Sequence, residues 1–223
     1  MAQNASLATQ QASAPTISRR AYNALTFGIV TLCFLVTFGE YTFFSAGNLM
    51  LGGGGLLSLI ISLVGTFGGI ILMGAGKSKQ SVAMSAIGLA IFTLTFGATV
   101  ALALTQYPIG SINYAFSITA CLSAIFLILG VLFPNFFSRI GGVLFAGLIG
   151  VLLIEMISTF FFHIQQGWLD YLVVLLFCGF LGYDAYLMSN DAPTVPNAIF
   201  YASDIFVDVV NILLRVLRIM DRD

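Results

Sequence analysis

Residues 81–104, SVAMSAIGLAIFTLTFGATVALAL, form an apolar run without a charged side chain, and runs of this kind decide the fold. A hydrocarbon core about 30 Å thick requires about 20 helical residues, because a backbone in lipid must satisfy its hydrogen bonds within the segment. The runs of near-spanning length are residues 21–44, 56–76, 81–104, 112–133, 142–163, 168–188 and 198–219. The sequence therefore predicts an all-α polytopic membrane protein with a bundle of seven transmembrane helices. The last segment is semi-polar, and a re-entrant helix is the alternative for it.

The composition excludes an ordinary soluble domain. Hydrophobic residues make up 59% of the chain and charged residues only 8%, whereas globular domains average about 25% charged residues. The formal net charge of -1 leaves no basic surface for nucleic acid, which we exclude as a partner. Residues 1–18 are polar and lack periodicity, so we expect a disordered N-terminal tail, followed by one transmembrane helical domain over residues 19–223.

Lysine and arginine near the predicted loops indicate the orientation. Arg19, Arg20, Lys77, Lys79 and Arg139 fall on one side if every preceding segment crosses. The positive-inside rule makes that side cytoplasmic and places the N-terminus there. Seven crossings would then place the basic C-terminal end outside, which is a further reason to consider a re-entrant last segment. We expect a multi-pass integral membrane protein, and the short loops favour a bacterial plasma (inner) membrane.

Ionisable residues within the spans are costly in lipid and usually face a bundle interior or a water-filled cavity, so they are the candidates for function. The last segment carries five polar side chains that fall close to one line along a helix. They are Asp204, Asp208, Asn211, Arg215 and Arg218. Pairing among these residues, or arginines that extend to the interface, is the alternative to a functional stripe.

Asp184 and Asp208 are expected to lie at comparable depth, because the turn at residues 191–196 makes the last two helices antiparallel. Two carboxylates at close range inside a bundle cannot both ionise easily, and the pair would share one proton. A hard cation such as calcium prefers several oxygen ligands, which Asp184, Asp208, Asn211 and backbone carbonyls can supply. Glu155 is a further acid that could line the same cavity. The pair is therefore a candidate proton sensor or calcium site.

The same region resembles the Bax inhibitor-1 (transmembrane Bax inhibitor motif) family, in the form of its bacterial members. The resemblance rests on Tyr183-Asp184, a short polar turn, and the sequence DVVNILLRVLR from Asp208 to Arg218. It implies a pH-sensitive calcium leak channel gated by a proton-sharing, hydrogen-bonded pair, here Asp184 and Asp208. It also implies a basic latch at the end of the second span, for which Lys77 is the nearest residue.

Other functions remain open on the sequence. A membrane interaction protein is the main alternative, because family relatives resemble regulators of a membrane-bound protease or suppressors of cell death. A proton-coupled small-solute transporter is the third, since acids within membranes also build proton relays. The Gly-x-Gly-Asp motif of intramembrane aspartyl proteases is absent before Asp204 and Asp208, so we expect no enzyme. We expect no cofactor apart from calcium as a permeant or ligand ion. The expected partners are the lipid bilayer, calcium or protons, and another membrane protein.

Overall fold

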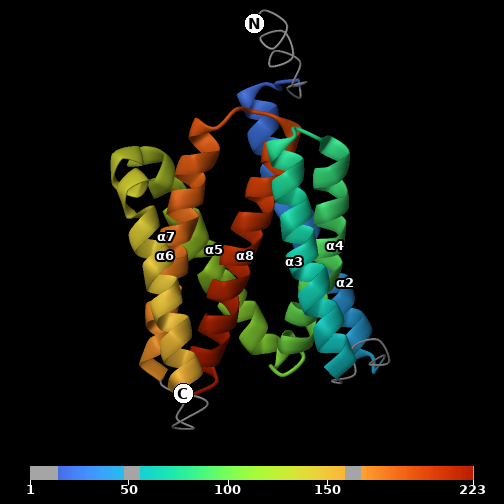
Figure 1. The fold of residues 1–223 in the computed structure, drawn as a ribbon. Helices are drawn as coiled ribbons and strands as arrows, with labels where there is room; N and C mark the ends of the chain where they lie inside the picture. The colour runs from blue at the N-terminus through green and yellow to red at the C-terminus, as the bar shows by residue number, and fades with distance from the viewer. Residues whose placement is uncertain (1–14, 48–55, 159–166, 223) are drawn as a thin grey trace, which may run out of the picture. The chain divides into compact units, whose positions relative to one another are not determined.

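The computed structural model describes residues 15–47, 56–158 and 167–222 (Figure 1). Every regular secondary-structure element in these ranges is an α-helix, and the all-α prediction is confirmed. The helices are α2 (Arg19–Ser45), α3 (Leu56–Ser78), α4 (Val82–Leu104), α5 (Ile109–Leu132), α6 (Pro134–Ile157), α7 (Gly167–Asn190) and α8 (Val195–Met220).

Six of the described helices, α2 to α7, are long and apolar enough to cross a membrane. Large apolar side chains stand exposed on them, such as Ile71, Val143 and Leu175, which are 70%, 71% and 63% exposed. Lipid covers side chains of this kind in a polytopic membrane protein, whereas water would penalise them. Helix α8 is not among the six, so the seventh span stays a prediction.

Helix α8 is amphipathic, which explains why its mean hydropathy is lower than that of α3 to α7. Ile205, Phe206, Val210, Ile212 and Leu217 are each at most 1% exposed and cluster on one side of the helix at about 100° per residue. The predicted polar stripe occupies the other side. The helix therefore combines a buried apolar face with a line of charged groups.

Contacts divide the chain into two units. Unit 1 comprises Met1–Ala101 and Asp191–Ser203, and unit 2 comprises Leu102–Asn190 and Asp204–Asp223. Helix α8 thus begins in unit 1 and continues in unit 2.

Glycines allow close helix packing inside each unit. In unit 1, a Cβ built on Gly69 of α3 would lie 2.8 Å from the Gly88 carbonyl oxygen, and a Cβ on Gly88 of α4 would lie 2.8 Å from the Gly69 carbonyl oxygen. In unit 2, α7 packs against α5 and α6, and a Cβ on Gly130 of α5 would overlap the carbonyl oxygen of Gly182 in α7. Small residues bring helix backbones together in lipid, where packing drives association.

The start of α6 differs from the sequence prediction, which placed a loop at residues 134–141. Pro134 is the first residue of α6, and Phe133 alone separates it from α5. Proline suits this position because its φ angle is already helical and its missing N–H has no intrahelical partner there. Arg139 therefore lies within α6 rather than in a loop.

Residues 15–18, which were predicted to belong to a disordered tail over residues 1–18, make tertiary and capping contacts. The Ile17 N–H donates a hydrogen bond to the Pro193 carbonyl at 2.8 Å, and the Ser18 side chain caps the start of α2. A tertiary hydrogen bond of this kind cannot be predicted from the polar composition of a segment. The rest of the predicted tail, residues 1–14, lies outside the described residues.

Candidate functional site

Two buried carboxyl groups meet in unit 2. Asp184 of α7 is 9% exposed, and Asp208 of α8 is 6% exposed. A side-chain hydrogen bond joins Asp208 to Asp184, and Asp204, one turn earlier on α8, lies within electrostatic range of Asp208. A carboxylate has no donor, so a hydrogen bond between two carboxyl groups requires a proton on one of them. A proton shared between α7 and α8 at this pair stays a prediction.

The surroundings of the pair are tightly packed. Ala185, next to Asp184, is 1% exposed, and the buried Cys178 thiol lies within electrostatic range of Asp208. The Oδ2 atom of Asp208 is buried and has no hydrogen-bond partner among the described residues. Because a buried polar atom without a partner is costly, this oxygen is a natural acceptor for a further proton or an ion.

Calcium binding at the pair stays a prediction. Within the described ranges, no group of three or more His, Cys, Asp or Glu side chains is placed to hold a metal ion. Calcium takes about six to eight oxygen ligands. Asp184 and Asp208 would therefore need backbone carbonyls or water to complete a calcium site.

A second group of charges in unit 2 is the Asp170 cluster, which comprises Glu155, Asp170, Arg215, Arg218 and Arg222. Asp170 Oδ1 lies 2.8 Å from Arg215 Nη1 and 3.3 Å from Arg218 Nη1, and Asp170 Oδ2 lies 2.9 Å from Arg222 Nη1. Arg215 also binds both carboxylate oxygens of Glu155, with Nη2 to Oε2 at 3.0 Å. The Asp170 side chain is only 2% exposed, so the guanidinium groups compensate a buried negative charge.

Asp170 was not predicted as a site residue, and Glu155 was predicted only as an acid that could line the cavity of the carboxyl pair. Asp170 is an acid inside the apolar run 168–188, which was a usable signal, but its place near the end of the run is equally typical of an interfacial residue. The structure pairs Glu155 with Arg215, and a place for Glu155 in the cavity of the carboxyl pair stays a prediction. Arg218 is 46% exposed at its side chain, and Asn211 donates a hydrogen bond within its own helix.

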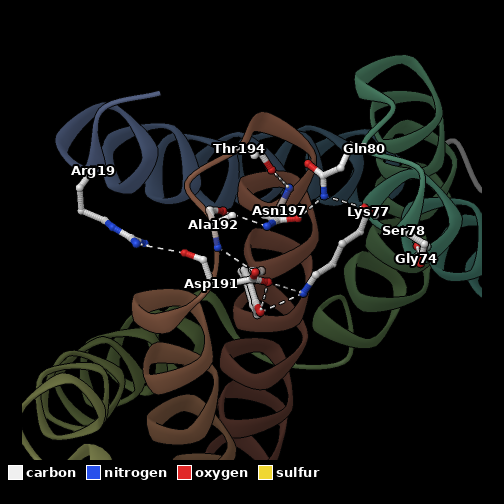
Figure 2. A network of polar contacts seen from close by, with 10 residues as sticks. Arg19, Gly74, Lys77, Ser78, Gln80, Asp191, Ala192, Thr194 and Asn197 are labelled. Carbon is white, nitrogen blue, oxygen red and sulfur yellow. Dashed lines mark hydrogen bonds and ion pairs between the residues drawn. The ribbon is translucent and has the colours of Figure 1, made fainter. Parts of the chain in front are cut away.

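A third polar group lies in unit 1 and is called the Lys77 network (Figure 2). Lys77 Nζ lies 3.0 Å from Asp191 Oδ2 and donates a hydrogen bond to the Tyr201 hydroxyl at 2.8 Å. Tyr201 in turn donates to Asp191 Oδ2 at 2.8 Å. The Lys77 ammonium also lies 4.5 and 4.0 Å from the ring centroids of Phe200 and Tyr201, which adds cation–π attraction. The predicted role of Lys77 as a latch stays a prediction.

Further hydrogen bonds extend the Lys77 network to other segments of unit 1. Gln80 donates to Asn197 Oδ1 at 3.1 Å, and Asn197 donates to the Ala192 carbonyl at 2.8 Å. Arg19 donates to the Asp191 carbonyl at 3.0 Å (Figure 2). The network thus ties the α3–α4 turn and the start of α2 to the loop between α7 and α8.

The Lys77 network contains an acid with a lowered pKa. Burial alone would raise the pKa of Asp191, but hydrogen bonds from Tyr201, Lys77 and the Ala192 N–H, with the Lys77 charge, lower it below the ordinary 3.8. Asp191 is therefore ionised near neutral pH. Asp191 and Tyr201 were not predicted as site residues.

Comparisons with known proteins agree with this architecture. A family model described as "Inhibitor of apoptosis-promoting Bax1" (Bax1-I) matches residues 15–223. This chain belongs to the Bax inhibitor-1 family. One relative is the Golgi anti-apoptotic protein of Vaccinia virus (strain Lister), 25% identical over an alignment 218 residues long that covers 94% of this chain and 89% of the relative. Another is the inner membrane protein YbhL of Escherichia coli (strain K12), 23% identical over an alignment 224 residues long that covers 96% of this chain and 94% of YbhL.

Family membership and the apolar helices agree on the environment of the chain. YbhL is named as an inner membrane protein, and six described helices of this Bax inhibitor-1 family member can span a bilayer. The chain is therefore a multi-pass integral membrane protein. The matched region includes all three polar groups described above.

Proposed function

We propose that this Bax inhibitor-1 family member is a pH-sensitive cation leak that conducts calcium and is gated by the proton shared between Asp184 and Asp208. The observation that carries the proposal is the hydrogen bond between these two buried carboxyl groups on α7 and α8. The shared proton holds the two helices together at this point. Its loss leaves two like charges in a medium of low dielectric constant, where they repel strongly.

Ion selectivity follows from the same two groups. The doubly ionised pair is a strong ligand for a hard divalent cation, because carboxylate oxygens are the preferred ligands of calcium. Asp204 adds a third negative charge within electrostatic range. We therefore expect flux to rise as the pH rises through the titration of the pair. The mechanism involves no catalysis.

Calcium flux into liposomes that contain the purified protein tests the proposal, at mildly acidic, neutral and mildly alkaline pH. Asp208→Asn keeps the shape of the side chain and can still donate a hydrogen bond to Asp184, but it cannot release the shared proton. We expect this variant to lose the pH dependence and to stay in the low-flux state. Asp221→Asn removes the same charge from an exposed acid and is the matched control.

Two results would contradict the proposal. The first is the absence of flux at every pH from folded wild-type protein. The second is an Asp208→Asn variant with the same pH dependence as the wild type.

A second candidate function is the binding of a regulatory membrane partner. It is favoured by the contact between Ile17 and Pro193, which connects the N-terminal segment to the loop that precedes α8. The Vaccinia virus relative is named as an anti-apoptotic protein, and a role in such a pathway would work through a partner. Deletion of residues 1–14 should then abolish co-purification of the partner while calcium flux is unchanged. If the partner still co-purifies after the deletion, residues 1–14 are excluded as its binding site.

A further inference from the structure

The Asp170 cluster joins three helices of unit 2 at a distance from the carboxyl pair. Asp170 and Asp184 are separated by 14 residues of α7, which is about 21 Å at 1.5 Å per residue. Asp208 and Arg215 are separated by seven residues of α8, or about 10 Å, and the long arginine side chain bridges much of the difference. Helices α7 and α8 are therefore linked at two levels, once by the carboxyl pair and once by the cluster.

Arg215 is the member of the cluster that connects all three helices. It binds Glu155 of α6 through both of its terminal nitrogens and Asp170 of α7 through Nη1. Within the described residues, the ion pairs of Arg218 and Arg222 are both with Asp170. Arg222 also lies beyond Met220, where α8 ends, so it cannot set the position of the helix as directly.

We propose that Arg215 is a positioning residue that sets the register of α8 against α6 and α7 and thereby holds Asp208 opposite Asp184. Apolar packing between helices is not directional, and a slip of one turn, about 5.4 Å, would break the hydrogen bond between the carboxyl groups. A buried ion pair with fixed partners does select one register, because any other leaves buried charges without compensation. The planar guanidinium suits this role, since it binds two carboxylates in a fixed geometry.

This inference rests on the proposed function only for its effect on flux, and a native thiol offers an independent readout. Cys178 is 2% exposed and lies within electrostatic range of Asp208, so it reports on the contact between α7 and α8. In a Cys33→Ala, Cys121→Ala background, Cys178 is the single cysteine of the chain. The rate at which a water-soluble maleimide labels it in detergent measures how often this contact opens.

We expect Arg215→Gln to raise the labelling rate about tenfold or more, because a tenfold change corresponds to only about 1.4 kcal/mol and the variant leaves Glu155 without its partner. Arg215→Lys keeps the positive charge but loses the planar guanidinium group. Its labelling rate should fall between the rates of the wild type and Arg215→Gln. Arg222→Gln removes another guanidinium from Asp170 and is the matched control, with an expected rate close to that of the wild type. Glu155→Gln removes only the contact between Arg215 and α6. It replaces Arg215→Gln in the labelling assay if that variant does not fold.

The flux assay separates the inference from the proposed function. The expected result is that Arg215→Gln shifts the pH profile of calcium flux, whereas Arg222→Gln does not. Faster labelling of Arg215→Gln in a protein without flux would refute the leak but support the positioning role. An unchanged labelling rate and an unchanged pH profile in both Arg215→Gln and Glu155→Gln would overturn the inference, even if the wild type conducts calcium.

Discussion

The close approach of α3 and α4 makes Gly69→Ala a sharp test of helix packing in unit 1. An alanine Cβ at this position would lie 2.7 Å from the Phe92 Cβ and 2.8 Å from both the Phe92 nitrogen and the Gly88 carbonyl oxygen. The last two atoms belong to the backbone, so rotation of a side chain cannot relieve the overlap. Ordinary contact begins at 3.4 Å, and the two helices must therefore separate locally by about 0.6 Å.

The expected cost follows from this forced separation. Overpacking of a close-packed interior destabilises proteins by about 1–3 kcal/mol. We expect a value in the upper half of that range, because Phe92 is fully buried and cannot move outward. Gly68→Ala is the matched control, since it makes the same change one residue earlier on α3, where a Cβ would have no neighbour within 4 Å.

Thermal unfolding in detergent, followed by far-ultraviolet circular dichroism, measures the difference. Gly69→Ala should unfold at a clearly lower temperature than the wild type, and Gly68→Ala should unfold at the wild-type temperature or slightly above it, because alanine favours the helix. A wild-type unfolding temperature for Gly69→Ala would refute the close α3–α4 packing. Equal losses in both would instead assign the effect to the flexibility of α3.

Three further predictions use the same unfolding assay. Tyr201→Phe removes the hydroxyl that links Lys77 to Asp191, and we expect the free energy of unfolding to fall by about 1 kcal/mol; no loss would mean that the direct ion pair with Asp191 and the cation–π contacts hold Lys77 without the hydroxyl. The pKa of Asp191 is lowered, so its stabilising contribution is present above the unfolded-state pKa and is lost as the pH falls through the folded-state value. The stability difference between the wild type and Asp191→Asn should therefore stay constant around neutral pH and shrink only below about pH 4; a difference that changes near pH 7 would contradict this assignment. Gly130→Ala should destabilise α5 against α7 by about 1–3 kcal/mol, whereas Gly142→Ala, with no neighbour within 4 Å, should not; the reverse order would exclude the described packing.

The comparison between sequence and structure is most instructive at the helix ends. The apolar runs predicted helices at the seven described helical segments, six of which can cross a membrane, because the length of an apolar run is a local property of the chain. The start of α6 was predicted eight residues too late, because the break was assigned to Pro134, which instead begins the helix. The order of residues 15–18 was missed since it depends on a hydrogen bond between Ile17 and the distant Pro193.

The candidate site shows a similar division. The motif around Asp184 and Asp208 led to the expectation that these carboxyl groups meet, because a short turn makes their helices antiparallel and neighbouring. By contrast, no local pattern pointed to Asp170 as a partner of Arg215, 45 residues away. No local pattern predicted the pairing of Lys77 with Tyr201, 124 residues away, either.

The amino-acid sequence by itself determined that this chain is helical, membrane-embedded and a member of the Bax inhibitor-1 family, because hydrophobic length and a short motif are local features. Only the tertiary structure decided which charged groups compensate one another. Those partners depend on the rotation and register of each helix, and a register is set by the packing of several helices at once. In the Asp170 cluster a buried acid meets guanidinium groups, in the Lys77 network a partly exposed acid meets a lysine and a tyrosine, and at the carboxyl pair two acids meet each other.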